Sequence, residues 1–151
     1  MGQRTSSPKR PPGPLDQASK KACKVILLLD TTVLIDVLRA RQNRRSLLAD
    51  LIEAGHTLST SAINVGEVYS GMKPNEAAVT EALLSSLECF AITAALARKA
   101  GSLKAQWARK GQTLTLADMI VAAVALENDL TLLTDNRKDF PIPGLKFYTL
   151  R

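Results

Sequence analysis

Four of the aspartates in this sequence stand where chain geometry favours chemistry. Asp30 directly follows an apolar run, Asp118 opens a long apolar stretch, and Asp135 and Asp139 follow another apolar segment. Because His56 is the only histidine and the cysteines lack metal-ligand spacing, neither a Ser-His-Asp triad nor a zinc site can be assembled. Carboxylates held together repel one another unless protons or a cation lie among them. Oxygen ligands select Mg²⁺ or Mn²⁺, which indicates metal-assisted phosphodiester hydrolysis.

Each of these aspartates also has a purely structural interpretation. Asp30 can cap the helix expected after it, and from the residues alone capping and catalysis weigh equally. Asp118 follows Thr115 by three residues and matches a capping box. A carboxylate at the mouth of a buried helix is unfavourable unless it is paired or metal-bound, so a site role is preferred there. Among the polar residues over 135–139, at least one is expected to be a turn former.

Hydrophobic periodicity predicts alternating strands and helices. Strands are expected at 25–29, 56–59, 87–92, 130–134 and 146–149, and helices at 32–39, 46–54, 61–72, 74–86, 93–110 and 116–126. This order implies a mainly parallel sheet between helical layers, with right-handed crossovers. At the carboxyl edge of such a sheet, the ends of the first and fourth strands meet the starts of their helices. Asp30, Asp118 and the loop 135–139 can therefore converge.

Two further residues depend on their helical faces. Glu67 lies opposite the apolar stripe of its helix, which predicts exposed surface unless the fold supplies a partner for it. Trp107 recurs at helical spacing with Leu96, Ala100 and Leu103. We therefore expect Trp107 to be a mostly buried core residue rather than a base-stacking platform.

Positive charge gathers in two places. Of the net charge of +6, the first 24 residues contribute +5, and the rest of the chain is nearly neutral. Residues 1–22 lack apolar periodicity and are predicted to be a disordered basic tail, either a solvated leader or a weak nucleic-acid contact, before a domain over 23–151. Between the first two helices a cluster of arginines could bind RNA phosphates, although a solvated charge run is the plainer interpretation. Its members are Arg39, Arg41, Arg44 and Arg45.

No apolar run is long enough for a membrane span or for the core of a signal peptide. Two cysteines without metal spacing are typical of free thiols in a reducing compartment. A cytoplasmic protein is expected.

Four motifs together resemble those of PIN-domain ribonucleases. In chain order they are LDTTVLID at 29–36, NVGE at 64–67, LADMIVAA at 116–123 and LTDNRKDF at 133–140. Each motif is weak alone, but four in the same order and spacing are specific. Over residues 25–151 the sequence is most similar to the VapC toxins of bacterial type II toxin–antitoxin pairs.

This resemblance implies a three-layer α/β/α PIN fold and an RNA endonuclease that uses Mg²⁺ or Mn²⁺. It implies Asp30 and Asp118 as the metal ligands and Glu67 as the third acid, which overrides the surface interpretation of Glu67. Family members commonly place Asp or Asn where this chain has Asn136, which brings no charge. We therefore expect Asp139 to be the fourth carboxylate and Asn136 to support it by orienting a ligand or a water.

The resemblance also implies supporting residues and partners. Thr31 and Thr134 would support the site by hydrogen bonds, with Thr134 acting through the attacking water or directly. Related toxins form homodimers and are silenced by a small antitoxin whose peptide enters the acidic cleft. The chain before Asp30 is longer than is usual in the family, which is a second departure from its pattern.

Two other classes of function were weighed against this one. A phosphoaspartyl enzyme or receiver domain would need an acid at Thr32, or an acidic pair at Leu28 and Leu29, and is disfavoured. A PIN protein that is not a toxin, either an RNA-processing nuclease or a catalytically silent RNA- or protein-binding module, is the stronger rival. Silence is disfavoured because a decayed site should have lost at least one of its acids.

Overall fold

The computed structural model describes residues 24–150. The tail predicted over 1–22, and with it the domain boundary at residue 23, lies outside the described residues. In chain order the elements are β1 (Ile26–Leu29), α2 (Thr31–Leu38), α3 (Arg44–Glu53), β2 (Thr57–Ser61), α4 (Ala62–Ser70), the 3₁₀ turn η1 (Pro74–Glu76), α5 (Ala77–Ser85), β3 (Glu88–Phe90), α6 (Ala94–Arg109), α7 (Leu116–Glu127), β4 (Thr131–Leu133), the 3₁₀ turn η2 (Arg137–Asp139) and β5 (Lys146–Phe147).

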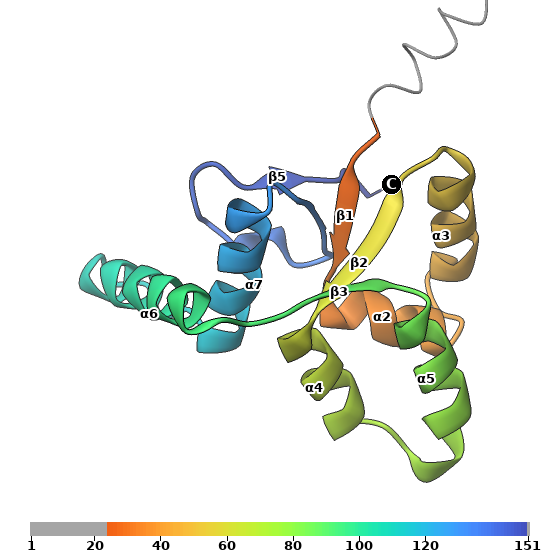
Figure 1. The fold of residues 1–151 in the computed structure, drawn as a ribbon. Helices are drawn as coiled ribbons and strands as arrows, with labels where there is room; N and C mark the ends of the chain where they lie inside the picture. The colour runs from red at the N-terminus through yellow and green to blue at the C-terminus, as the bar shows by residue number, and fades with distance from the viewer. Residues whose placement is uncertain (1–23, 151) are drawn as a thin grey trace, which may run out of the picture.

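The strands form one parallel sheet in the order β3-β2-β1-β4-β5. β1 lies at its centre, where Leu28 is level with Ser59 of β2 on one side and Leu132 of β4 on the other. α6 and α7 pack on one face, and α2, α3 and α5 pack on the other (Figure 1). The predicted three-layer α/β/α fold with a parallel sheet is confirmed.

The central position of β1 explains why its sequence is apolar throughout. Leu28 packs against the α7 side, whereas Leu27 and Leu29 pack against the α2 side, and all three are fully buried. Successive strand residues point to opposite faces, so a central parallel strand needs apolar residues at every position. α7 is also buried over Val121–Ala125. Within residues 24–150, no helix is both long and apolar enough to cross a membrane.

Two predicted features differ in detail. The helix expected over 74–86 begins as the turn η1, and α5 starts only at Ala77, because Pro74 suits the first position of a helical turn. Trp107 packs against the core as expected, but it is half-buried rather than mostly buried. α6 runs out beyond the sheet (Figure 1), so the sheet does not cover its second half. The Lys110 ammonium instead lies 4.7 Å from the centre of the indole ring.

Helices α2 and α3 end in the same backbone motif with different residues. Gly55 ends α3 with a φ of 93°, as a Schellman motif requires. Ala40 takes the equivalent place after α2 with a φ of 52°. Its N–H donates to the Val37 carbonyl, and the Arg41 N–H donates to the Asp36 carbonyl. A β-carbon disfavours this left-handed conformation, so the loop between α2 and α3 is locally strained.

Candidate active site

Asp30 is held at the junction of the two central strands. It follows β1, and its N–H donates to the Leu133 carbonyl at the end of β4, 3.1 Å away. Its carboxylate Oδ1 accepts from the Thr31 N–H at 2.9 Å, and Oδ2 accepts from the Thr134 hydroxyl at 2.8 Å. The side chain is therefore the N-cap of α2 and is also fixed by the neighbouring strand. The capping interpretation made from the sequence is confirmed, and the same carboxylate remains the candidate for the chemistry.

The surroundings of Asp30 disfavour its negative charge, because only 7% of the residue is exposed. Burial raises the pKa of the Asp30 carboxyl above its ordinary value of 3.8, and the hydrogen bonds from Thr134 and Thr31 oppose that rise. The negative charges of Glu67 and Asp139 raise the pKa further. Two other predicted site residues therefore lie near enough to repel Asp30.

Glu67 is exposed on α4, as its helical position predicted, yet it meets the site. The Thr31 hydroxyl donates to Glu67 Oε1 at 2.8 Å, and Asn64 Nδ2 donates to the same hydroxyl at 3.0 Å. Ser61 in turn donates to Asn64 Oδ1 at 2.5 Å, which explains why its side chain does not cap α4. The outer face of α4 thus lines the carboxyl edge of the sheet.

Asn64 and Ser61 adjoin the candidate site. The sequence suggested Thr60 or Ser61 as the cap of this helix, and the Ser61 side chain does not cap it. Asn64 and Ser61 are fully buried beside the site, where each satisfies a polar partner. The available signal was an asparagine three residues after a serine and three before an acid, inside a helix, where asparagine is a poor helix former.

Asp118 lies in the first turn of α7. Its N–H donates to the Thr115 hydroxyl at 3.1 Å, so the predicted N-cap is present. Burial raises the pKa of the Asp118 carboxyl, the Thr115 contact opposes the rise, and the charges of Asp30 and Asp139 raise it again. The capping bond uses the backbone of Asp118 and does not occupy its carboxylate.

The three polar residues after β4 have separate roles. Asp139, half-buried in η2, is the one whose charge acts on both Asp30 and Asp118. Asp135 Oδ1 pairs with Arg44 Nη2 at 2.5 Å, and the Asn136 N–H donates to the Thr134 hydroxyl at 3.0 Å. We name the group Asp30, Glu67, Asp118 and Asp139 the carboxylate edge.

The arginines between α2 and α3 are not equivalent. Arg44 is buried against Asp135. The Arg45 guanidinium donates to the carbonyls of Val37 and Leu38 at 2.7 and 3.0 Å, which caps the end of α2. Arg39 and Arg41 are exposed. Because Arg44 and Arg45 are engaged within the protein, Arg39 and Arg41 are the better candidates for phosphate contacts.

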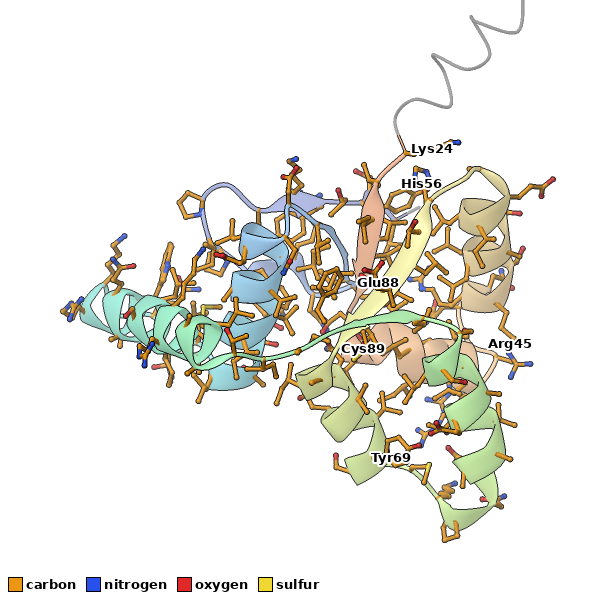
Figure 2. The ribbon with its side chains drawn as sticks, in the orientation of Figure 1. Lys24, Arg45, His56, Tyr69, Glu88 and Cys89 are labelled. Carbon is orange, nitrogen blue, oxygen red and sulfur yellow. The ribbon has the colours of Figure 1, made fainter. Side chains whose placement is uncertain are left out.

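His56 lies away from the carboxylate edge. Figure 2 shows it beside Lys24, near the starts of β1 and β2, whereas the carboxylates follow the opposite ends of the strands. Its Nδ1 accepts from the Val25 N–H at 3.1 Å. This geometry supports the interpretation of His56 as a strand-edge residue.

The carboxylate edge suits a hard cation. Within residues 24–150, no three side chains of His, Cys, Asp or Glu are gathered as a ready metal-binding group. Mg²⁺ nevertheless needs only one or two protein carboxylates, since waters and substrate phosphates fill its other positions. Asp30 and Asp118 repel each other, and a cation near both would relieve that repulsion. The oxygen-only donor set therefore fits Mg²⁺ or Mn²⁺.

A separate apolar groove of about 880 Å³ lies on the face covered by α3 and α5. It is lined by the end of α2, by α3, by β2 and by α5, and we name it the apolar groove. Ile52 and Val79 on its walls are 60% and 55% exposed. Its lining holds no cluster of acids, so the carboxylate edge is the candidate for the chemistry and the groove is suited to docking.

Comparisons with known proteins agree with this geometry. The PIN domain family model matches residues 27–142. Ribonuclease VapC19 and ribonuclease VapC10 of Mycobacterium tuberculosis are each 32% identical to this chain, over 76% of it and 92% of VapC19, and over 78% of it and 87% of VapC10.

Solved structures give the same fold. A toxin–antitoxin complex from Klebsiella pneumoniae contains a chain that is 31% identical, with a TM-score of 0.66 over 82% of this chain and 96% of that one. VapBC2 of Rickettsia felis bound to a promoter DNA fragment gives a TM-score of 0.72 at 24% identity, over 83% and 99%. The chain belongs to the PIN-domain family, and within that family to the VapC group.

Proposed function

We propose that this chain is a Mg²⁺- or Mn²⁺-dependent endoribonuclease and the toxin of a type II toxin–antitoxin pair. The observation that carries the proposal is the carboxylate edge, where the charges of Glu67 and Asp139 raise the pKa of Asp30, and those of Asp30 and Asp139 raise the pKa of Asp118. A constellation of this kind is typical of metal-assisted phosphoryl chemistry. The VapC relatives, which are named ribonucleases, support RNA as the substrate.

Asp30 and Asp118 would hold the ion, which when bound polarises the phosphoryl oxygen and lowers the pKa of a water. The residues around them supply orientation. The Thr31 N–H and the Thr134 hydroxyl each fix one oxygen of Asp30, so its carboxylate is preorganised. The Thr31 hydroxyl occupies Glu67 Oε1, which leaves Oε2 to accept a proton from the attacking water.

Asp139 adds negative charge beside Asp30 and Asp118 and is proposed as the fourth carboxylate. Asn136 keeps the Thr134 hydroxyl in place through its backbone N–H. Arg39 and Arg41, both exposed, are proposed to contact RNA phosphates.

We propose that the antitoxin binds in the apolar groove and continues to the carboxylate edge. α2 joins the two regions, since Thr31 at its start belongs to the site and Leu38 at its end lines the groove. A helix of this length spans about 12 Å, which a few residues of an extended peptide can cover. Exposed Ile52 and Val79 would be buried by such a partner, and the similar Klebsiella chain was solved as a toxin–antitoxin complex.

The rival functions differ in their partner. A PIN nuclease devoted to RNA processing accounts for the carboxylate edge but leaves the apolar groove without an occupant. A silent module can occupy the groove but leaves the carboxylate edge unexplained, because all four acids are present. A homodimer acting in the cytoplasm completes the proposal, and sedimentation of the purified protein tests the dimer.

The function is tested by incubating total RNA with the purified protein in Mg²⁺, in Mn²⁺ and in EDTA, with Asp30→Asn in parallel. We expect discrete fragments that need the metal and that the variant does not produce. Metal-dependent cleavage by Asp30→Asn would contradict the site, and the absence of cleavage in either metal would contradict the nuclease function. Co-expression with the product of the adjacent gene separates toxin from processing enzyme, because only a toxin should be inhibited by it.

A further inference from the structure

Several features of the position of Arg44 are unfavourable for an arginine. It is the first residue of α3, where a cation is disfavoured by the helix dipole. Its side chain is only 10% exposed, and its Nε is buried without a hydrogen-bond partner among the described residues. Each of these features is unfavourable for folding. Violations of local preference that gather on one residue commonly mark a functional requirement.

The ion pair of this guanidinium leads to the carboxylate edge. Arg44 Nη2 reaches Asp135 Oδ1, and Asp135 stands between Thr134 and Asn136. The Thr134 hydroxyl donates to Asp30 Oδ2 while it accepts the Asn136 N–H. Two consecutive residues, Asp135 and Thr134, therefore connect Arg44 to the proposed metal ligand Asp30.

The strand itself does not fix this segment. β4 ends at Leu133, whose carbonyl accepts the Asp30 N–H, and Thr134 to Asn136 lie beyond the ladder. A loop without ladder bonds needs side-chain contacts to hold a single conformation. Among the described residues, Arg44 at the start of α3 supplies an ion pair to Asp135 that holds this segment in place.

We propose that Arg44 is a positioning residue for the carboxylate edge. Through Asp135 it fixes the loop that carries Thr134, and the Thr134 hydroxyl in turn sets the orientation of the Asp30 carboxylate. This inference rests on the proposed nuclease function of the same site. It explains an arginine whose burial brings little stability, because residues that support metal ligands often matter more for activity than for folding.

The test compares Arg44→Met, Asp135→Asn and the double variant with Arg45→Met. Arg45 is a matched control, since this neighbouring arginine directs its guanidinium to the carbonyls of Val37 and Leu38 at the end of α2. The first readout is the set of backbone amide NMR signals in metal-free protein. We expect Arg44→Met and Asp135→Asn to shift the signals of Asp30 and of residues 134–136, and Arg45→Met to shift only those of α2 and α3.

The second readout is the rate of RNA cleavage. We expect kcat to fall about 10-fold in Arg44→Met and in Asp135→Asn with KM unchanged, as for lost supporting partners of a ligand. The double variant should lose no more than either single variant, because both remove one connection. Arg45→Met should lower the unfolding midpoint and leave kcat unchanged.

The two readouts separate failure of this inference from failure of the function. Amide shifts confined to α3, or a kcat equal to that of the wild type in Asp135→Asn, would overturn the positioning role. If the wild-type protein does not cleave RNA, the nuclease proposal fails, and the amide signals still decide whether Arg44 positions Asp30. Should Arg44→Met fail to fold, Asp135→Asn carries the test, because its side chain is already one-third exposed.

Discussion

The carboxylate edge and the apolar groove lie at opposite ends of α2, and each is unfavourable in the isolated protein for a different reason. At the edge, burial and the charges of neighbouring acids raise the pKa values of buried Asp30 and half-buried Asp118. The groove holds large apolar side chains that remain exposed, at 60% for Ile52 and 55% for Val79. The carboxylate edge therefore needs a compensating cation, and the apolar groove needs an apolar surface to cover it.

This contrast indicates two kinds of partner. Repelling carboxylates are stabilised by a cation, whereas an exposed apolar groove is stabilised by another apolar surface. A change in the groove should therefore spare cleavage, and the loss of one carboxylate should spare most of the antitoxin binding, because the groove supplies the apolar contacts. The predictions below use that independence, beginning with the largest expected effect.

Asp118→Asn should abolish RNA cleavage and keep the fold. The change removes a proposed metal ligand, and because metal-ion stabilisation of the transition state is worth several kcal/mol, we expect a loss of about 10³-fold. The cap of α7 survives, since Thr115 bonds to the backbone N–H of Asp118. Cleavage assays with circular dichroism as the control check both parts. Cleavage at the wild-type rate would break the site assignment, and unfolding would support a capping role.

Ile52→Asp should weaken antitoxin binding and spare cleavage. Placing a charge on the wall of the apolar groove leaves it desolvated in the complex, so we expect affinity to fall by about 30-fold or more. Titration calorimetry with the product of the adjacent gene measures the change. Ala105→Asp, on the exposed surface of α6, is the matched control and should bind normally. Equal losses in both variants would contradict the groove as the docking surface.

The stability of the metal-free protein should increase as pH falls from neutral toward the ordinary carboxyl range. Asp30 and Asp118 have raised pKa values when folded, so the folded state takes up protons more readily than the unfolded state. Their contribution is present at low pH and is lost as pH rises through the folded pKa. Urea unfolding in EDTA measures this slope, and Asp118→Asn should flatten it. A slope of the opposite sign over this range, or one unchanged in Asp118→Asn, would show that ionised carboxylates at the edge do not destabilise the folded protein.

Ala40→Gly should have the smallest effect and should touch neither region. Ala40 takes a φ of 52° where Gly55 takes the equivalent position after α3. Relief of left-handed strain, partly offset by the greater entropy of unfolded glycine, should raise the unfolding free energy by up to about 1 kcal/mol. Thermal unfolding measures the change, and Gly55→Ala is the reverse control, expected to destabilise. Loss of cleavage in Ala40→Gly would instead make the loop strain part of the site.

The parts of the molecule that sequence reasoning found are those encoded locally. The apolar run before Asp30 and the Thr115 cap before Asp118 each announce an element and its terminus within a few residues. Strand order then follows from the alternation of elements, and the parallel sheet is confirmed. The proposed role of Asp139 needed the resemblance as well, because Asp135 and Asn136 were equally plausible from the residues.

The parts it missed depend on contacts between distant segments. Arg44 and Asp135 are 91 residues apart, so no local pattern could predict that the pair would remove one arginine from the surface. The apolar groove is assembled from separate elements that lie far apart in the sequence, and the residues that each contributes look ordinary there. Glu67 is exposed on its own helix, yet the path of α4 beside Thr31 brings it to the site.

The most direct test of this two-region account is a crossed comparison of wild type, Asp118→Asn and Ile52→Asp, with RNA cleavage and binding of the adjacent gene's product measured on the same preparations. The account predicts that Asp118→Asn loses cleavage and keeps most of its binding, which the apolar groove supplies, and that Ile52→Asp keeps cleavage and loses binding. Metal-dependent cleavage by Asp118→Asn at the wild-type rate would contradict the central claim that the carboxylate edge is the active site.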